Sequence, residues 1–373
     1  MSRTAADRSE PRGVVEDPDL AHDDDAGGPR LDFTPRKAAF AAVFVVVALG
    51  ALYVLLPQLA GLDDTWRRLE QGTPGWLLLA LLFTVGTFAG YVALFQAVFV
   101  RAGSRIDWRE SYQICMAGLA ATRLFSAGGA GGLVLIAWAL RRSGMNARTV
   151  ADRTVSFLVL QYLIYMLALI VCGFGLRWGL FEGPAPFSIT VIPAFLALVI
   201  TVLGLSVAFV PTDFERRLRG FASRQGRIGV LAQRLANGPA AASAGMRDAL
   251  AHVRERDPAL LGAVGYWAFQ IGVLWAAFHA FGEPPAIAVL IMAFFVGMLG
   301  NLLPLPGGIG GVDGGMIGAL VAFGVDGGLA VVSVLIFRAY TFWLPTLPGA
   351  IAYLQLRRTV DRWRTQRPLH YTN

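Results

Sequence analysis

The chain has 373 residues, of which 55% are hydrophobic and 15% are charged, and its mean hydropathy is +0.57. An average soluble domain carries roughly 25% charged residues, so this composition excludes an ordinary soluble protein. The net charge of +7 does not indicate a nucleic-acid partner, because the basic residues lie between long apolar runs and not on one amphipathic face. We therefore expect an all-α polytopic membrane protein.

The chain begins with a polar segment and continues with apolar runs. Residues 1–36 are rich in Asp, Arg, Gly and Pro without an apolar period, which predicts a disordered cytoplasmic segment. The apolar run at 38–60 follows Arg36 and Lys37, is too long for a signal-peptide core, and predicts a first spanning helix. Five more runs have the length that a bilayer requires, so six spanning helices are expected; the five lie at 76–100, 153–175, 188–210, 259–281 and 328–354.

Two further apolar stretches, 110–140 and 286–325, are interrupted by glycines at 128–132 and 307–311. Glycine and proline disfavour a continuous helix at these interruptions. Arginines flank the first stretch on both sides, whereas the segment 282–327 contains no Lys or Arg. The positive-inside rule then predicts that the first stretch enters and leaves from the cytoplasm, and the second from outside. Because irregular backbone at this depth must be buried in protein or line a wet cavity, we expect two re-entrant helical hairpins.

An internal repeat supports the hairpins. Glycines at 128, 129, 131 and 132 recur at 307, 308, 310 and 311, an offset of 179 residues. The same offset carries the spans at 80–102 and 149–175 onto 259–281 and 328–354. Their opposite orientation predicts an inverted-topology repeat, which is typical of transporters with a site near the midplane. The alternative is that these glycines only let helices pack closely.

The expected domain organisation follows from this repeat. A transmembrane domain at 37–356 contains repeat one at 38–175 and repeat two at 188–354. The arginine-rich linker at 211–258 is expected to form amphipathic cytoplasmic helices along the anionic leaflet. A basic cytoplasmic tail is expected at 357–373.

Charged residues within spanning segments are expensive and indicate function by default. Away from the segment ends, only Arg123, Asp313 and Arg338 meet this condition, and each lies on or near a broken element. Arginine forks and free N–H groups at a half-helix suit a phosphate or carboxylate. Asp313 could balance an arginine or receive a cationic head group. Alternatively, the arginines snorkel or pair with Asp313 for structure alone.

The candidate substrate-binding set combines these charges with the hairpin glycines and two aromatic residues near Arg338. It comprises Arg123, Arg338, Asp313, Gly128, Gly129, Gly307, Gly308, Gly310, Tyr340 and Trp343. The sequence contains no Ser/His/Asp set, P-loop or dinucleotide fingerprint. Its two cysteines, Cys115 and Cys172, lie in apolar segments without a metal-ligand pattern. We therefore expect no enzymatic activity, no cofactor and no metal.

At these motifs the sequence resembles the lysylphosphatidylglycerol synthase transmembrane family, also called the flippase-like or UPF0104 family. The resemblance covers nearly everything from 38 to 356, and its most specific parts are the run Pro304–Asp313 and the later Arg338-Ala339-Tyr340. Looser matches are Trp343-Leu344-Pro345 and the stretch from Ala139 to Gly144 leading to Asp152-Arg153.

This sequence also departs from the family pattern. Asp313 stands where glutamate is common, and Gly131-Gly132 stands where a glycine-glutamate pair is common. Bifunctional members carry a soluble aminoacyltransferase domain after the membrane part, whereas this chain ends at Asn373. The resemblance therefore implies the flipping half alone, without aminoacylation of lipid.

The resulting expectation is a flippase-like transporter that translocates an anionic lipid, either a phospholipid or a polyprenyl-phosphate carrier, between leaflets. It would lie in a plasma membrane of the bacterial inner-membrane type, with both termini cytoplasmic. Its expected partners are membrane lipids and no nucleic acid; a separate lipid-modifying enzyme and an oligomer stay open. The alternatives are a secondary transporter of a soluble anion, or a non-catalytic membrane partner of a lipid or glycan transferase.

Overall fold

The computed structural model describes residues 72–100, 104–124, 130–208, 242–302 and 308–365, and these residues form helices and connecting turns without a β-strand. Five helical runs among them are long and apolar enough to cross a membrane. They are α4 (Pro74–Phe99), α7 (Ala147–Arg177), α8 (Phe187–Ala208), α11 (Ala259–Phe281) and the run Gly327–Trp363. These coincide with five of the six predicted spans and make the chain a multi-pass membrane protein. The predicted span at 38–60 and the polar segment 1–36 lie outside the described residues.

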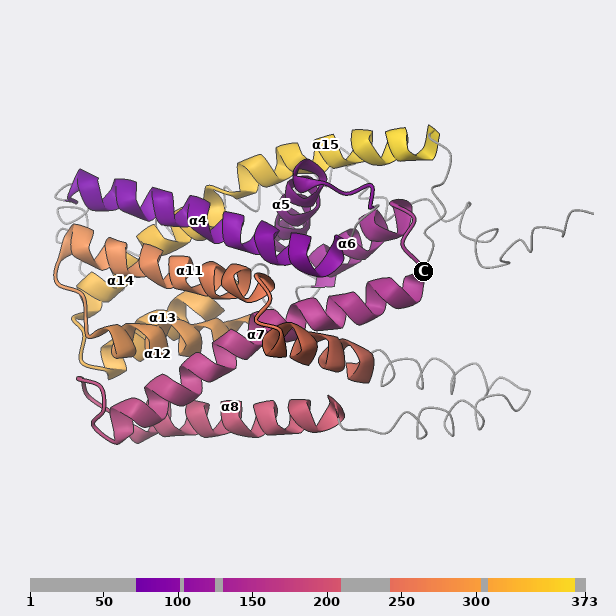
Figure 1. The fold of residues 1–373 in the computed structure, drawn as a ribbon. Coiled ribbons are helices and arrows are strands. Elements are labelled where there is room, and N and C mark those ends of the chain that lie inside the picture. The colour runs from indigo at the N-terminus through magenta and orange to yellow at the C-terminus, as the bar shows by residue number, and fades with distance from the viewer. Residues whose placement is uncertain (1–71, 101–103, 125–129, 209–241, 303–307, 366–373) are drawn as a thin grey trace, which may run out of the picture.

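Each of the two glycine-interrupted stretches contains a pair of short helices. The first pair is α5 (Trp108–Leu124) and α6 (Ala130–Arg142). The second is α12 (Ile287–Met298), which continues into the 3-10 turn η1 (Leu299–Leu302), and α13 (Gly311–Ala322). Within each pair the two helices contact one another, and they lie between the longer helices in Figure 1. An offset of 179 carries the first pair onto 287–303 and 309–321, within a few residues of the second.

Glycines hold the members of each pair close together. A Cβ atom on Gly118 would lie 3.0 Å from the Ile136 side chain, and one on Gly132 would collide with the Gly118 backbone. In the second pair, a Cβ on Gly315 would lie 3.1 Å from the Cα of Gly297. Gly118 and Gly297 are themselves 179 residues apart. Close packing of helices is thus one role of glycine in both stretches.

The helices α4 and α11 run side by side and join the two halves of the molecule (Figure 1). Their backbones approach closely at two glycines. A Cβ atom on Gly262 would lie 2.6 Å from the backbone nitrogen of Leu94, and one on Gly90 would lie 2.8 Å from that of Tyr266. Small residues at such a crossing allow the van der Waals packing that associates helices in lipid.

Replacing Gly262 with alanine is therefore expected to lower the free energy of unfolding by about 1–2 kcal/mol, because the backbones of α4 and α11 must separate. The matched control is Gly318→Ala in α13, where an added Cβ would meet nothing within 4 Å. Alanine there should be neutral or slightly stabilising, since it favours a helix more than glycine does. Thermal unfolding in detergent micelles measures both, and equal melting temperatures would contradict the predicted close approach.

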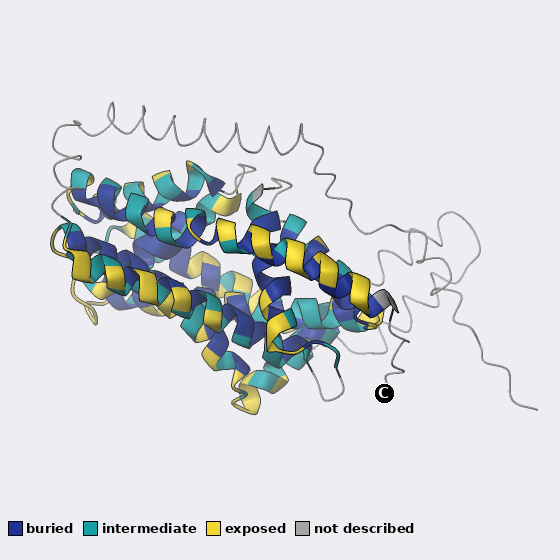
Figure 2. Cartoon of the chain, turned by 90° about the horizontal axis from the view of Figure 1, so that it is seen from above, coloured by how far each residue is buried: buried dark blue, intermediate teal, exposed yellow. Residues whose placement is uncertain are grey.

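Buried apolar side chains form two clusters, and each combines elements from both halves of the chain. The first cluster draws mainly on α4, α5, α6 and the start of α7, together with the start of α11 and with α15. The second draws mainly on α11 to α14 and the later part of α7, with single residues of α4 and α8. Figure 2 shows buried residues along the inward faces of the helices and exposed ones along the outer faces. The exposed residues of α8 include Ile192, Phe195 and Leu203, an apolar outer face that suits contact with lipid.

The last span is not continuous. Helix α14 (Gly327–Arg338) passes into a π-helical turn, η3 (Ala339–Trp343), before α15 (Thr346–Thr365) begins. A single span at 328–354 was expected, so the break is a feature that hydropathy did not predict. Gly349 packs at the start of α15, where an added Cβ would lie 2.8 Å from the Ala120 side chain.

The helix α15 also continues past residue 356, where we expected the tail 357–373 to begin. Leu356, Val360 and Trp363 are buried at helical spacing, and α15 packs against α5. The Thr359 hydroxyl donates to Gln113 Oε1 at 2.9 Å across this contact. An amphipathic stripe thus extends the helix, and residues 366–373 lie outside the described part of the chain.

The described end of the linker is a helix at 242–254, and the rest of the linker lies largely outside the described residues. It packs on the start of α7, because a Cβ atom on Gly245 would lie 2.6 Å from the Asp152 carbonyl oxygen. Asp257 then accepts a hydrogen bond from the Ala259 N–H, at 2.8 Å, and contacts His252 Nδ1 at the same distance. Burial raises the pKa of the Asp257 carboxyl, but these hydrogen bonds outweigh it and hold the pKa below its usual value.

Candidate functional site

The break in the last span leaves backbone carbonyl groups without helical partners. The Leu344 N–H donates to the Ala339 carbonyl at 2.9 Å, five residues back, which closes the π turn. The next residue, Pro345, has no N–H and cannot continue either an α or a π ladder. The carbonyls at the end of η3 therefore need donors from elsewhere. Such π turns are frequent at functional sites.

Arg123 of α5 supplies those donors. Its Nη2 donates to the Thr341 carbonyl at 2.7 Å and its Nη1 to the Phe342 carbonyl at 3.0 Å. The Phe342 carbonyl also accepts from the Thr346 hydroxyl at 2.7 Å. A cation at the carbonyl end of a helix is favoured by the helix dipole. The first glycine-interrupted stretch is thus tied to the break in the last span.

Arg338, the last residue of α14, pairs with Asp313 of α13. Their Nε and Oδ1 atoms lie 2.6 Å apart, and the side chains are only 11% and 17% exposed. The other carboxylate oxygen of Asp313 accepts from the Gly310 N–H at 2.9 Å, at the N-terminus of α13, where negative charge is favoured. Gly310 and Gly308 have φ angles of +83° and +67°, a left-handed conformation that glycine adopts without steric cost.

The two guanidinium groups share one aromatic neighbour. Arg338 Cζ lies 4.5 Å from the centroid of the Phe342 ring, and Arg123 Cζ lies 5.3 Å from it. Arg123 also lies 6.0 Å from the centroid of Phe88 in α4. Cation–π contacts of this kind stabilise a guanidinium away from water. Four elements, α4, α5, α13 and the broken last span, therefore converge on this cluster.

The charges of the cluster do not balance. Among the described residues, no carboxylate oxygen lies within 4.0 Å of Arg123, whose partners are two carbonyls and two rings. Arg338 has its carboxylate in Asp313. The cluster therefore carries one formal positive charge, which an anion could neutralise. Arginine offers such an anion a planar, bidentate fork.

The structure places the other predicted site residues unevenly around this cluster. Trp343 packs edge-to-face on Phe342 at a centroid distance of 5.1 Å, and Tyr340 is half-buried against the second apolar cluster. Gly308 and Gly310 shape the entry to α13. Gly128, Gly129 and Gly307 lie outside the described residues.

Sequence reasoning missed four groups that contact the arginines: the ring and the carbonyl of Phe342, the Phe88 ring and the Thr341 carbonyl. Apolar residues within apolar segments give no signal of their own. The available clue was the pair Pro345 and Pro348, because two residues without an N–H group in one span predict a break with unpaired carbonyls.

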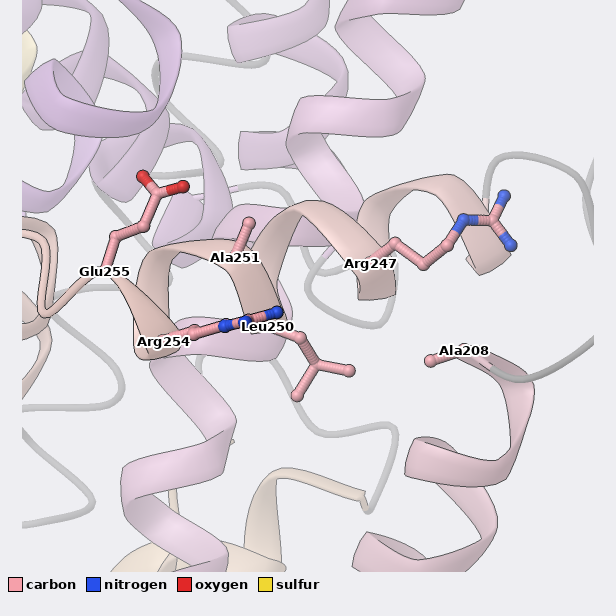
Figure 3. A pocket seen from close by; sticks show the side chains of 6 residues that line it. All are labelled: Ala208, Arg247, Leu250, Ala251, Arg254 and Glu255. Carbon is pink, nitrogen blue, oxygen red and sulfur yellow. The ribbon is translucent and has the colours of Figure 1, made fainter.

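A cleft of about 530 Å³ lies elsewhere, between the end of α8 and the helix 242–254, and shares no residue with the arginine cluster. In Figure 3 the Leu250 side chain lies toward the end of α8, whereas Glu255 points away from it. Two arginines among its lining residues suit contact with an anionic membrane surface. The lining residues are Ala208, Arg247, Leu250, Ala251, Arg254 and Glu255.

Comparison with known proteins identifies relatives of the whole membrane region. The family described as "Lysylphosphatidylglycerol synthase TM region" matches residues 40–349. A UPF0104 membrane protein of Methanothermobacter thermautotrophicus is 24% identical over 337 residues, which cover 85% of this chain and 95% of the relative. Two shorter matches to UPF0104 membrane proteins of the same organism are 40% and 33% identical over 86 and 91 residues. These cover 23% and 24% of this chain, and 26% of the relative in both cases.

Proposed function

Because the chain belongs to the lysylphosphatidylglycerol synthase transmembrane family, we propose that it moves the anionic head group of a membrane lipid from one leaflet to the other. The family match and the UPF0104 relatives support a role connected with membrane lipids. The lipid moves down its own concentration gradient between the leaflets. The proposal includes no catalytic step and no cofactor.

The observation that carries the proposal is the state of Arg123. Arg123 lies in α5, within one of the two glycine-interrupted apolar stretches. Its guanidinium donates to two carbonyls and contacts two aromatic rings. It has no carboxylate partner among the described residues. Arg123 is half-buried, and an unbalanced charge within a membrane segment is costly. A phosphate that enters the cluster would neutralise it through charge-assisted hydrogen bonds. The cluster is therefore suited to hold an anion inside the membrane.

The proposed architecture brings this cluster to the middle of the bilayer. In it, α5–α6 and α12–α13 are re-entrant hairpins from opposite sides, related as an inverted-topology repeat. The agreement of their bounds at an offset of 179 and the opposite arginine distributions of their flanks support this arrangement. Both termini are then cytoplasmic, in a plasma membrane of the bacterial inner-membrane type.

The proposal is tested with purified protein in proteoliposomes that contain phosphatidylglycerol with a fluorescent acyl chain. The wild type is expected to accelerate exchange between leaflets, and Arg123→Gln to slow it by at least about tenfold, since a charged hydrogen-bonding partner of the phosphate is lost. The matched control is Arg148→Gln, at a side chain that is 70% exposed, which should retain the wild-type rate. All variants are compared at equal amounts of inserted protein.

Two outcomes would count against the proposal. A wild type that moves neither phospholipids nor polyprenyl phosphates would remove the lipid-transport function, leaving a soluble-anion carrier or a partner subunit of a transferase. Equal slowing by Arg123→Gln and Arg148→Gln would leave transport but remove the role of the cluster.

A further inference from the structure

The charges within the apolar segments can be counted completely from the sequence, including the parts outside the described residues. The segments at 38–62, 72–100, 111–140, 154–176, 183–212, 258–282, 284–325 and 327–356 contain no Lys or Glu. Their only Arg and Asp residues are Arg123, Asp313 and Arg338. In particular, the glycine-interrupted breaks at 125–129 and 303–307 add no charge. The formal charge summed over these apolar segments is therefore +1.

The structure shows where that charge resides. Asp313 neutralises Arg338 at 2.6 Å, whereas Arg123 is held by neutral groups, the carbonyls of Thr341 and Phe342. Carbonyl dipoles and aromatic faces stabilise a guanidinium without cancelling its charge. One negative charge beside Arg123 would bring the net charge of the cluster to zero. A second negative charge would bring it to −1.

Lipid head groups differ in their net charge. A phosphodiester without an amine carries one negative charge, and a zwitterionic head group carries none overall. A phosphate monoester has a second pKa near 6, as in phosphoserine, so it carries close to two negative charges at pH 8. Because an unbalanced charge costs most where the dielectric constant is low, the neutral complex is the one that forms and crosses most easily.

We propose that the cluster of Arg123, Arg338 and Asp313 selects a phosphodiester head group with a single net negative charge over zwitterionic head groups and phosphate monoesters. This inference rests on the proposed function and narrows its substrate class. It favours phospholipids of the phosphatidylglycerol type over polyprenyl monophosphates.

The experiment measures binding separately from transport. Purified protein in uncharged detergent is titrated at pH 8 with three lipids that share one fluorescent acyl chain: phosphatidylglycerol, phosphatidylcholine and phosphatidic acid. The wild type is expected to bind phosphatidylglycerol more tightly than either of the others by roughly tenfold, the effect of one poorly screened charge. Translocation of the same lipids is then measured in proteoliposomes.

A series of variants changes the charge of the cluster with little change of shape. Arg123→Gln gives a charge of 0 and should shift the preference toward phosphatidylcholine. Asp313→Asn gives +2 and should shift it toward phosphatidic acid. The double variant restores +1 and should restore the preference for phosphatidylglycerol, although the overall affinity falls because the arginine fork is lost. The folding of each variant is verified by its elution from size-exclusion chromatography.

The outcomes separate the two proposals. If wild type binds the three lipids equally, or if the preference does not follow the charge series, selection by charge is overturned even where lipids are translocated. If phosphatidylglycerol is preferred and the series follows the charge but no lipid is translocated, selection by charge stands and the transport function is overturned.

Discussion

Replacing Asp313 with leucine is expected to lower the free energy of unfolding by about 3–5 kcal/mol, because Arg338 would remain buried without its carboxylate. The two side chains are 11% and 17% exposed, so solvent screens this charge poorly. Denaturation in mixed detergent micelles with increasing dodecyl sulfate measures the loss. Asp313→Asn is the informative control, since an amide oxygen can still accept from the Gly310 N–H while the charge is removed.

The double variant Asp313→Leu, Arg338→Met decides whether the charge pair causes this loss. Replacing a buried ion pair by apolar residues of similar size is often neutral, whereas removing one partner is strongly destabilising. The double variant is therefore expected to be more stable than Asp313→Leu alone. A double variant that is less stable than both Asp313→Leu and Arg338→Met would show that the two residues contribute independently to stability.

Most of the helical organisation could be predicted because the length of an apolar run is readable along the sequence. The spans at 259–281 and 188–210 agree with α11 and α8 within two residues. The register of a hydrogen-bond ladder has no such signal. The π turn at 339–343 therefore appeared only in the structure, although Pro345 marked the place where the ladder had to stop.

The three charges of the candidate site were visible in the sequence, whereas its neutral partners were not. Arg123, Arg338 and Asp313 stood out because each is a charge in an apolar segment, and pairing of the arginines with Asp313 was one expected alternative. The structure assigns that pairing to Arg338 and gives Arg123 two carbonyls. Sequence distance favoured Arg338, which ends the helix directly after that of Asp313, but nothing in the sequence indicated the carbonyl partners of Arg123.

The glycines show why one residue type supported two hypotheses. Gly308 and Gly310 adopt left-handed conformations at the entry to α13, whereas Gly132 and Gly297 let helices approach each other. Both uses require the absence of a Cβ atom. A glycine-rich motif therefore predicts a backbone constraint without specifying which one, and the closest contacts decide it.

Arg123→Met is expected to lower the free energy of unfolding by about 3 kcal/mol, because two charge-assisted hydrogen bonds to the end of η3 are lost. The Phe342 carbonyl keeps the Thr346 hydroxyl, so the loss falls mainly on the Thr341 carbonyl. Arg123→Lys should lie between methionine and wild type, since one ammonium cannot match the fork that spans both carbonyls. The same mixed-micelle denaturation measures all three.

A second substitution tests whether the unpaired carbonyl is the cause. Pro345→Ala restores an N–H group directly after the π turn, and this donor can extend the ladder toward the carbonyls that Arg123 now binds. In the Arg123→Met background it should therefore recover part of the lost stability, and in the wild type it should have little effect because those carbonyls already have partners. Equal effects in both backgrounds would mean that Arg123 and the proline break act independently, and that Arg123 is held at the site by its aromatic contacts instead.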